Sequence, residues 1–127
     1  MEKINFGLGR RAVIAAATLA VVLLGVAGCT STHIDPKTAT AIIDVRTALE
    51  YSEGHLQGAI NIDVEQPSFA SEVSSLDKMG SYILYCHSGH RAGIALDEMT
   101  QMGFKHLENA GGIDQAAQST GLPVVVN

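Results

Sequence analysis

The sequence contains no tryptophan, only two cysteines and only eight basic residues among its 127. Two cysteines exclude a small scaffold held together by several disulfides. The eight basic residues face thirteen acidic ones, for a formal net charge of −5. An acidic chain without a basic stripe argues against nucleic acid as a partner. Hydrophobic residues make up 46% of the chain, and its length suits one domain rather than two.

Long hydrophobic runs are scarce, and the single strong one covers residues 12–28. It follows a basic start and ends in small residues, a pattern that predicts an export signal over residues 1–28. The alternative is a retained transmembrane helix. That alternative is disfavoured because spanning a bilayer takes about 20 apolar residues, and this run is shorter, rich in Ala and without a basic stop.

The end of this run, Val26-Ala27-Gly28-Cys29, resembles the lipobox of bacterial lipoproteins. In that family the peptide is cut just before the cysteine, which carries lipid. The resemblance implies that Cys29 is a lipid attachment site, so the mature chain would be anchored to a membrane without spanning it. The expected location is the periplasmic or extracytoplasmic face of the cell envelope. Residues 29–40 are polar and predict a lipidated tether before a domain over 41–127.

Strand-like and helix-like segments alternate from residue 41 onward. Strands are expected at 41–45, 59–62, 82–85 and 106–108. Helices are expected at 47–53, within 65–79 and at 91–102, the first with a capping box from Thr47 and Glu50. Residues 110–112 (Ala-Gly-Gly) predict a turn. This alternation predicts an α/β domain with a mostly parallel central sheet flanked by helices.

The chemistry-bearing segment is the loop Cys86-His87-Ser88-Gly89-His90-Arg91. It joins a predicted strand to the N-terminus of a predicted helix. Unpaired amides and the positive end of the helix dipole would therefore face the loop centre and favour a thiolate and other anions. Small residues permit a tight turn, and the arginine adds a fixed cation. The loop predicts a cysteine nucleophile beside an anion pocket.

This loop resembles the active-site loop Cys-x-x-Gly-x-Arg of the rhodanese family. Other motifs extend the resemblance over about residues 41–113: Asp44-Val45-Arg46, Glu50-Tyr51, residues 54–62 (GHLQGAINI), Met102-Gly103-Phe104 and residues 109–112 (NAGG). The short layout most resembles the small phage-shock protein E type. The resemblance implies a rhodanese-like fold.

The resemblance also implies an activity. Cys86 would be the catalytic residue, taking sulfane sulfur from thiosulfate or a persulfide donor and passing it to cyanide or a thiol. The donor would bind at His87, Ser88, Gly89, His90 and Arg91. No cofactor or metal is implied. The expected partners are the small sulfur-donor anion, the acceptor, the membrane through Cys29, and a reducing protein that protects the exposed thiolate from overoxidation.

Other interpretations of the same residues remain open. A persulfide carrier or sensor, or a partner-binding module, would need the same loop but little turnover. Zinc could bind Cys86, His87 and His90, although no fourth ligand is evident. Related phosphatases and arsenate reductases have one more residue between the cysteine and the arginine, which disfavours phosphoryl chemistry. Asp44 and Arg46 predict a structural ion pair, and His55 a hydrogen bond that stabilises a turn.

Overall fold

The computed structural model describes residues 32–127. The predicted signal segment 1–28 and the predicted lipid site Cys29 lie outside the described residues, so both stay predictions. Among the residues that are described, no helix is both long enough and apolar enough to cross a membrane.

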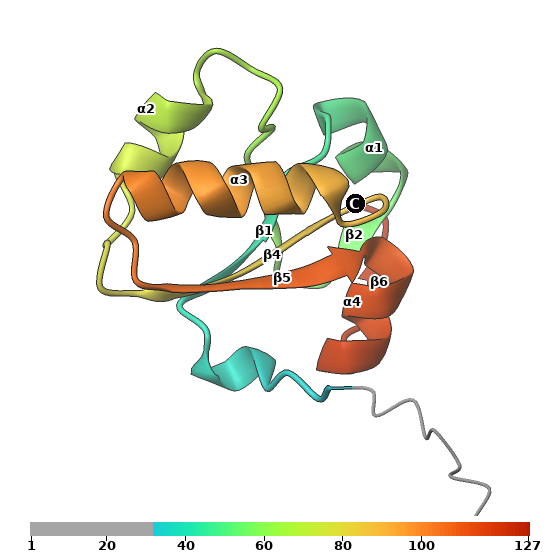
Figure 1. Cartoon of the computed structure of the whole chain (residues 1–127). Helices are drawn as coiled ribbons and strands as arrows, with labels where there is room; N and C mark the ends of the chain where they lie inside the picture. The colour runs from blue at the N-terminus through green and yellow to red at the C-terminus, as the bar shows by residue number, and fades with distance from the viewer. Residues whose placement is uncertain (1–31) are drawn as a thin grey trace, which may run out of the picture.

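The core of the fold is a four-stranded sheet in the order β3-β1-β4-β5, in which every pair of neighbours is parallel (Figure 1). Its strands are β1 (Ala41–Asp44), β3 (Ile60–Asn61), β4 (Ser81–Cys86) and β5 (His106–Gly112). A separate antiparallel pair joins β2 (His55–Leu56) to β6 (Val124–Val125). All four main strands therefore end at one edge of the sheet, where ligands of parallel α/β folds bind.

Helices cover both faces of the sheet, as Figure 1 shows. They are the short 3₁₀ helix η1 (Pro36–Thr38), α1 (Ala48–Glu53), α2 (Phe69–Ser74), α3 (His90–Gln101) and α4 (Ile113–Thr120). The prediction of an α/β fold with a mostly parallel sheet flanked by helices is confirmed.

Strand β4 builds two cores because its side chains alternate between the faces. Tyr82, Leu84 and Cys86 pack in the core beneath α2 and α3. Ile83 and Tyr85 pack in the second core, toward α4. Burial on both faces explains why β4 is a continuous apolar run rather than an alternating one.

Several elements differ from the sequence-based expectations. Helix α2 covers only six residues of the segment 65–79. Strand β5 continues through Gly112, where a turn was expected, and α4 follows at once. The predicted tether is packed in its later part: Ile34 is buried in the second core, and its amide donates to the carbonyl of Ser119 at 2.8 Å.

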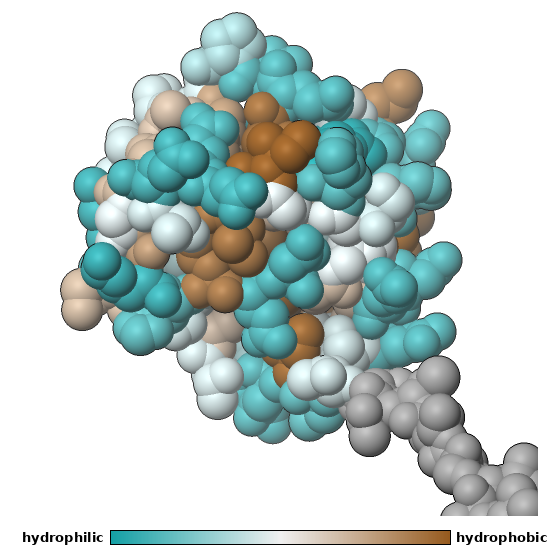
Figure 2. Space-filling view, viewed as in Figure 1, coloured by the Kyte–Doolittle hydropathy of each residue, from teal (hydrophilic) through white to brown (hydrophobic). Residues whose placement is uncertain are grey.

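The surface in Figure 2 is mostly hydrophilic, with separate hydrophobic patches rather than one continuous face. The large hydrophobic side chains that are exposed belong to Leu49, Ile60, Met79, Ile94, Val124 and Val126. They come from different segments, so within residues 32–127 no single helix or strand presents an apolar stripe to solvent.

Candidate active site

Cys86 is the last residue of β4, at the carboxyl edge of the sheet. Its side chain is fully buried, whereas the sequence predicted an exposed thiolate. The neighbouring His87, Ser88 and His90 are exposed. The sulfur thus lies at the base of a surface loop. The backbone amide of Gly89 donates to Cys86 Sγ at 2.9 Å, so the loop curls back over the sulfur.

The loop presents amides that have no partner of their own. Within residues 32–127, the amides of His87, Ser88, His90 and Arg91 donate to no protein acceptor. Gly89 makes this curl possible with φ +93°, in the left-handed region that glycine adopts without strain. It is also the N-cap of the 12-residue helix α3. The amide of Gly89 and the N-terminus of α3 therefore stabilise negative charge at this end of the loop.

The end of β5 supports the loop from the side. Gly112 is the register partner of Cys86, and a Cβ at Gly112 would lie 2.4 Å from the carbonyl oxygen of His87. Asn109 donates through Nδ2 to the carbonyl of Gly89 at 3.1 Å and accepts from the amide of Gly111 at 2.8 Å. The glycines at the end of β5 therefore allow close backbone contact with the loop rather than a turn.

Arg91 is held by two carboxylates from other segments. Its two terminal nitrogens donate to the two oxygens of Glu50, each at 2.8 Å, and Nη1 also lies 3.4 Å from Glu65 Oε2. Glu50 also accepts from the backbone amide and the hydroxyl of Thr47, at 3.1 and 3.0 Å. One carboxylate thus caps α1 and fastens the active-site loop.

The ion pair shifts the pKa of both partners. The hydrogen bond from Arg91 lowers the pKa of Glu50 from 4.5 to about 2, against the opposing effect of burial. The same hydrogen bond raises the pKa of Arg91, and the charge of the nearby Cys86 adds to the rise. Both groups are fully charged at neutral pH.

Asp44 and Arg46 form a buried structural pair, as their positions predicted. Arg46 Nη2 lies 2.6 Å from Asp44 Oδ2 and also donates to the carbonyl of Gly54. Burial alone would lower the pKa of Arg46, but the hydrogen bond and charge of Asp44 raise it overall. Because both side chains are enclosed and satisfied, they position the chain beside the site and do not face a ligand.

His55 also has the structural role that the sequence predicted. It is buried, its ring stacks on Tyr51 with centroids 3.7 Å apart, and Nδ1 lies 2.8 Å from the carbonyl oxygen of Tyr51. These contacts tie β2 to the end of α1.

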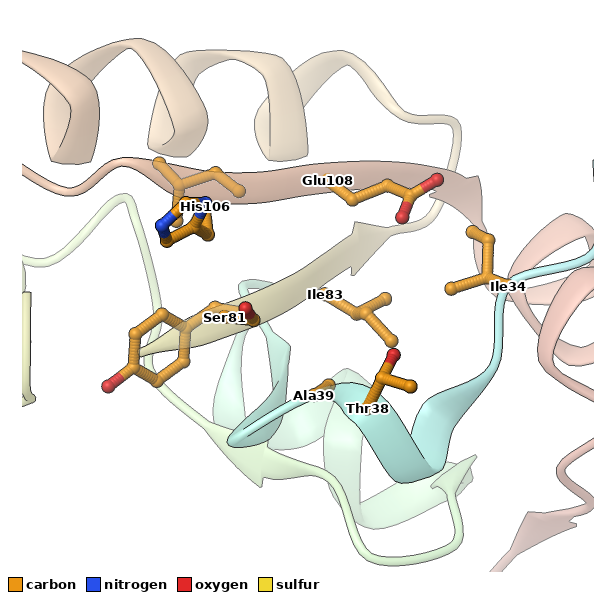
Figure 3. Close-up of a pocket in the computed structure, with 9 residues that line it drawn as sticks. Ile34, Thr38, Ala39, Ser81, Ile83, His106 and Glu108 are labelled. Atoms are coloured by element: carbon orange, nitrogen blue, oxygen red, sulfur yellow. The ribbon is translucent and has the colours of Figure 1, made fainter. Parts of the chain in front are cut away.

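A cavity of about 240 Å³ lies away from the cysteine, between η1 and the amino-terminal parts of β4 and β5 (Figure 3). Figure 3 shows Ile34 and Ile83 lining it together with His106 and Glu108. Its lining includes no cysteine. Within the part of the chain described, no group of three or more His, Cys, Asp or Glu side chains is arranged to hold a metal ion.

The sequence predicted the strand, the loop and the helix around Cys86, but it did not predict which residues hold the loop in place. Glu65 and Asn109 had no assigned role, and Glu50 was recognised only as a helix cap. No spacing rule connects Glu50 with Arg91, because the two are 41 residues apart in the chain. The ion pairs of Arg91 with Glu50 and Glu65 hold the loop closed against two other segments. The role of Arg91 in holding a donor stays a prediction, as do the donor contacts of residues 87–90.

The chain is similar to known proteins. The chain matches the family model described as "Rhodanese-like domain" over residues 30–118. It is 37% identical over 75 residues to "Thiosulfate sulfurtransferase PspE" of Escherichia coli (strain K12), a match that covers 59% of this chain and 72% of PspE. It is 35% identical over 77 residues to "Putative sulfur carrier protein YrkF" of Bacillus subtilis (strain 168), covering 60% of this chain but only 40% of YrkF.

Solved structures agree with these sequence matches. A structure described as "rhodanese with anions from E. coli" superposes with a TM-score of 0.56 and 35% sequence identity, covering 68% of this chain and 98% of that one. A solution structure of protein hp1203 from Helicobacter pylori 26695 superposes with a TM-score of 0.60 and 28% identity, covering 76% of this chain and 86% of that one. The loop, the sheet around it and these matches lead to one identification: the chain belongs to the rhodanese-like domain family.

Proposed function

We propose that this protein is a sulfurtransferase that moves sulfane sulfur from thiosulfate or a persulfide donor to a nucleophilic acceptor through a persulfide on Cys86. The observation that carries the proposal is a buried cysteine sulfur that accepts from the amide of Gly89, in a loop whose other amides have no protein acceptor within residues 32–127. PspE, which carries the name of a thiosulfate sulfurtransferase, supports the same reaction class.

The chemistry needs two displacements. The Cys86 thiolate attacks the outer sulfur of thiosulfate and forms an S–S bond. The bond between the two sulfur atoms of thiosulfate breaks, and its electron pair leaves with sulfite. Cyanide or a thiolate then attacks the terminal sulfur, and Cys86 departs as the thiolate. Each step transfers one sulfur atom and conserves charge, so no external oxidant or cofactor takes part.

The loop favours this chemistry over phosphoryl transfer. The terminal sulfur of a persulfide is a single anionic atom. The amides of His87, Ser88, His90 and Arg91 have no protein acceptor within residues 32–127 and could donate to it. Preorganised amides stabilise charge at a reacting atom without rearranging during the reaction. Four residues separate Cys86 from Arg91, whereas related phosphatases have one more residue between the cysteine and the arginine.

Thiocyanate formation from thiosulfate and cyanide tests the proposal on the full chain. The C86S variant should give no thiocyanate. The matched control, C29S, changes the other cysteine of the chain in the same way and should keep wild-type turnover. Equal turnover by C86S and the wild type would refute a Cys86 persulfide. Turnover by neither would refute sulfur transfer from thiosulfate.

A second candidate is a sulfur carrier that loads Cys86 without catalysing multiple turnovers. The similarity to YrkF, named a putative sulfur carrier protein, favours it. Intact mass and thiocyanate yield separate the candidates: a carrier gains one sulfur atom on Cys86 from a donor and gives at most one thiocyanate per chain. The enzyme loses that atom repeatedly as thiocyanate.

Peroxide treatment of the same samples tests the expected need for a reducing partner. If intact mass shows that Cys86 gains no oxygen after mild peroxide, that expectation is refuted.

We further propose that the chain is exported and anchored through lipid on Cys29, since its first 29 residues fit a lipoprotein signal. The C29S variant should leave the membrane fraction if this is right. Retention of C29S in washed membranes would refute lipid anchoring at this position.

A further inference from the structure

We infer that the site prefers sulfur donors of low charge, such as organic persulfides and thiosulfonates, over the thiosulfate dianion, and that Glu65 sets this preference. The inference rests on the proposed sulfur transfer and assigns its donor class. It follows from the distribution of charged side chains around the loop.

Arg91, the cation of the active-site loop, is already neutralised. Both oxygens of Glu50 accept from it at 2.8 Å, and Glu65 Oε2 lies 3.4 Å from the same guanidinium. One positive charge thus faces two carboxylates, and the three side chains together are negative. The two carboxylates differ in exposure: the Glu65 side chain is 58% exposed and that of Glu50 only 30%. Glu65 is the more open to an arriving donor.

The lysines of the described region lie at the wrong end of the sheet to compensate. Lys37, Lys78 and Lys105 shortly precede β1, β4 and β5, respectively. These three strands run parallel, so the lysines lie at the amino-terminal edge, opposite Cys86. The remaining cation of residues 32–127 is Arg46, which is 6% exposed and paired with Asp44. No unneutralised guanidinium or ammonium group is therefore left at the carboxyl edge of the described chain.

The backbone amides suit one negative charge, that of the persulfide. A thiosulfate dianion brings a second negative charge, on the sulfonate group that leaves as sulfite. The carboxylates of Glu50 and Glu65 beside Arg91 repel this second charge. An organic thiosulfonate has the same outer sulfur but one charge less. The reaction with benzenethiosulfonate balances in the same way: the Cys86 thiolate takes the outer sulfur, and benzenesulfinate leaves with the electron pair.

The test compares thiosulfate with benzenethiosulfonate, using cyanide as acceptor and the full chain at pH 8.5, where imidazole is ordinarily uncharged. The variant is E65Q, and the matched control is E108Q, an exposed glutamate on β5 outside the loop. Because Coulomb energy is proportional to donor charge, the logarithm of the gain in kcat/KM for the dianion should be twice that for the monoanion. For charges about 7 Å apart in a water-like dielectric, the gains are about threefold for benzenethiosulfonate and about sevenfold for thiosulfate.

The expected result is that the thiosulfate-to-benzenethiosulfonate ratio of kcat/KM rises about threefold in E65Q and is unchanged in E108Q. This change should shrink in 0.5 M salt, because screening weakens interactions between exposed charges. A purely structural role for Glu65 would change both donors equally at all salt concentrations, so an unchanged ratio in E65Q overturns the inference while sulfur transfer stands. Absence of Cys86-dependent thiocyanate from both donors would instead refute the proposed function and, with it, this inference.

Discussion

Adding a single methyl group at Gly112, by the substitution G112A, should slow catalysis without changing any residue of the active-site loop. The backbone of Gly112 has φ −74° and ψ 165°, which alanine adopts readily. Its Cβ, however, would lie 2.4 Å from the carbonyl oxygen of His87. Since real Cβ contacts are essentially never below 3.0 Å, that carbonyl must move by at least about 0.6 Å.

The carbonyl belongs to the active-site loop that begins at Cys86, so the displacement acts on the geometry of catalysis. A misplacement of about 1 Å can lower a rate by about 100-fold, so we expect G112A to lower kcat/KM by roughly 10- to 100-fold. Overpacking of this kind typically lowers the free energy of unfolding by about 1–3 kcal/mol. A folded but slow enzyme is the expected outcome.

Thiocyanate formation at 25 °C, with urea denaturation followed by circular dichroism, measures both effects. The matched control is G93A on α3, where the new Cβ would meet Asn109 Nδ2 at an ordinary 3.7 Å. Replacing a helical glycine by alanine stabilises by about 0.5–1 kcal/mol, so G93A should keep its activity and unfold at higher urea. Wild-type kcat/KM in folded G112A would refute the argument that Gly112 positions the loop.

Two further predictions concern the ion pairs beside the loop. D44A leaves the buried guanidinium of Arg46 unpaired, which should lower the free energy of unfolding by about 3–5 kcal/mol; a loss below about 1 kcal/mol in urea titrations would contradict this. E50Q should lower the free energy of unfolding by about 1 kcal/mol at pH 7, after allowance for its partial exposure. The Glu50 pKa of about 2 in the folded protein is below its ordinary 4.5, so this stabilisation is fully present above about pH 4.5 and is lost as pH falls toward 2. A difference between E50Q and the wild type that stays constant from pH 7 to pH 2 would show that Glu50 acts through something other than its charge.

The sequence predicted the elements that carry strong local signals. Helix α1 begins at the capping box of Thr47 and Glu50, and both hydrogen bonds of that box are formed. Strand β4 and helix α3 lie within a residue or two of their expected bounds, because a continuous apolar run and a periodic apolar face mark them. The loop between them followed from these two elements.

The elements that were missed depend on contacts distant in the sequence. Strands β2 and β6 have two residues each and pair across about 70 positions, which no local pattern reveals. The glycines at 111 and 112 suggested a turn, but Gly112 pairs with Cys86 and its missing side chain makes room for His87. Helix α4 starts directly after them with no polar N-cap side chain, so it lacked the usual start signal.

The shared carboxylate of Glu50 has a consequence for dynamics. Helix α1 has six residues and no buried side chain, and isolated helices shorter than about 12 residues are marginal in water. It is therefore among the first segments expected to open locally, before the sheet does. Each such opening withdraws Glu50 from Arg91 and loosens the loop over Cys86. The rate at which the amides of α1 exchange with deuterium should thus report how often the loop is released.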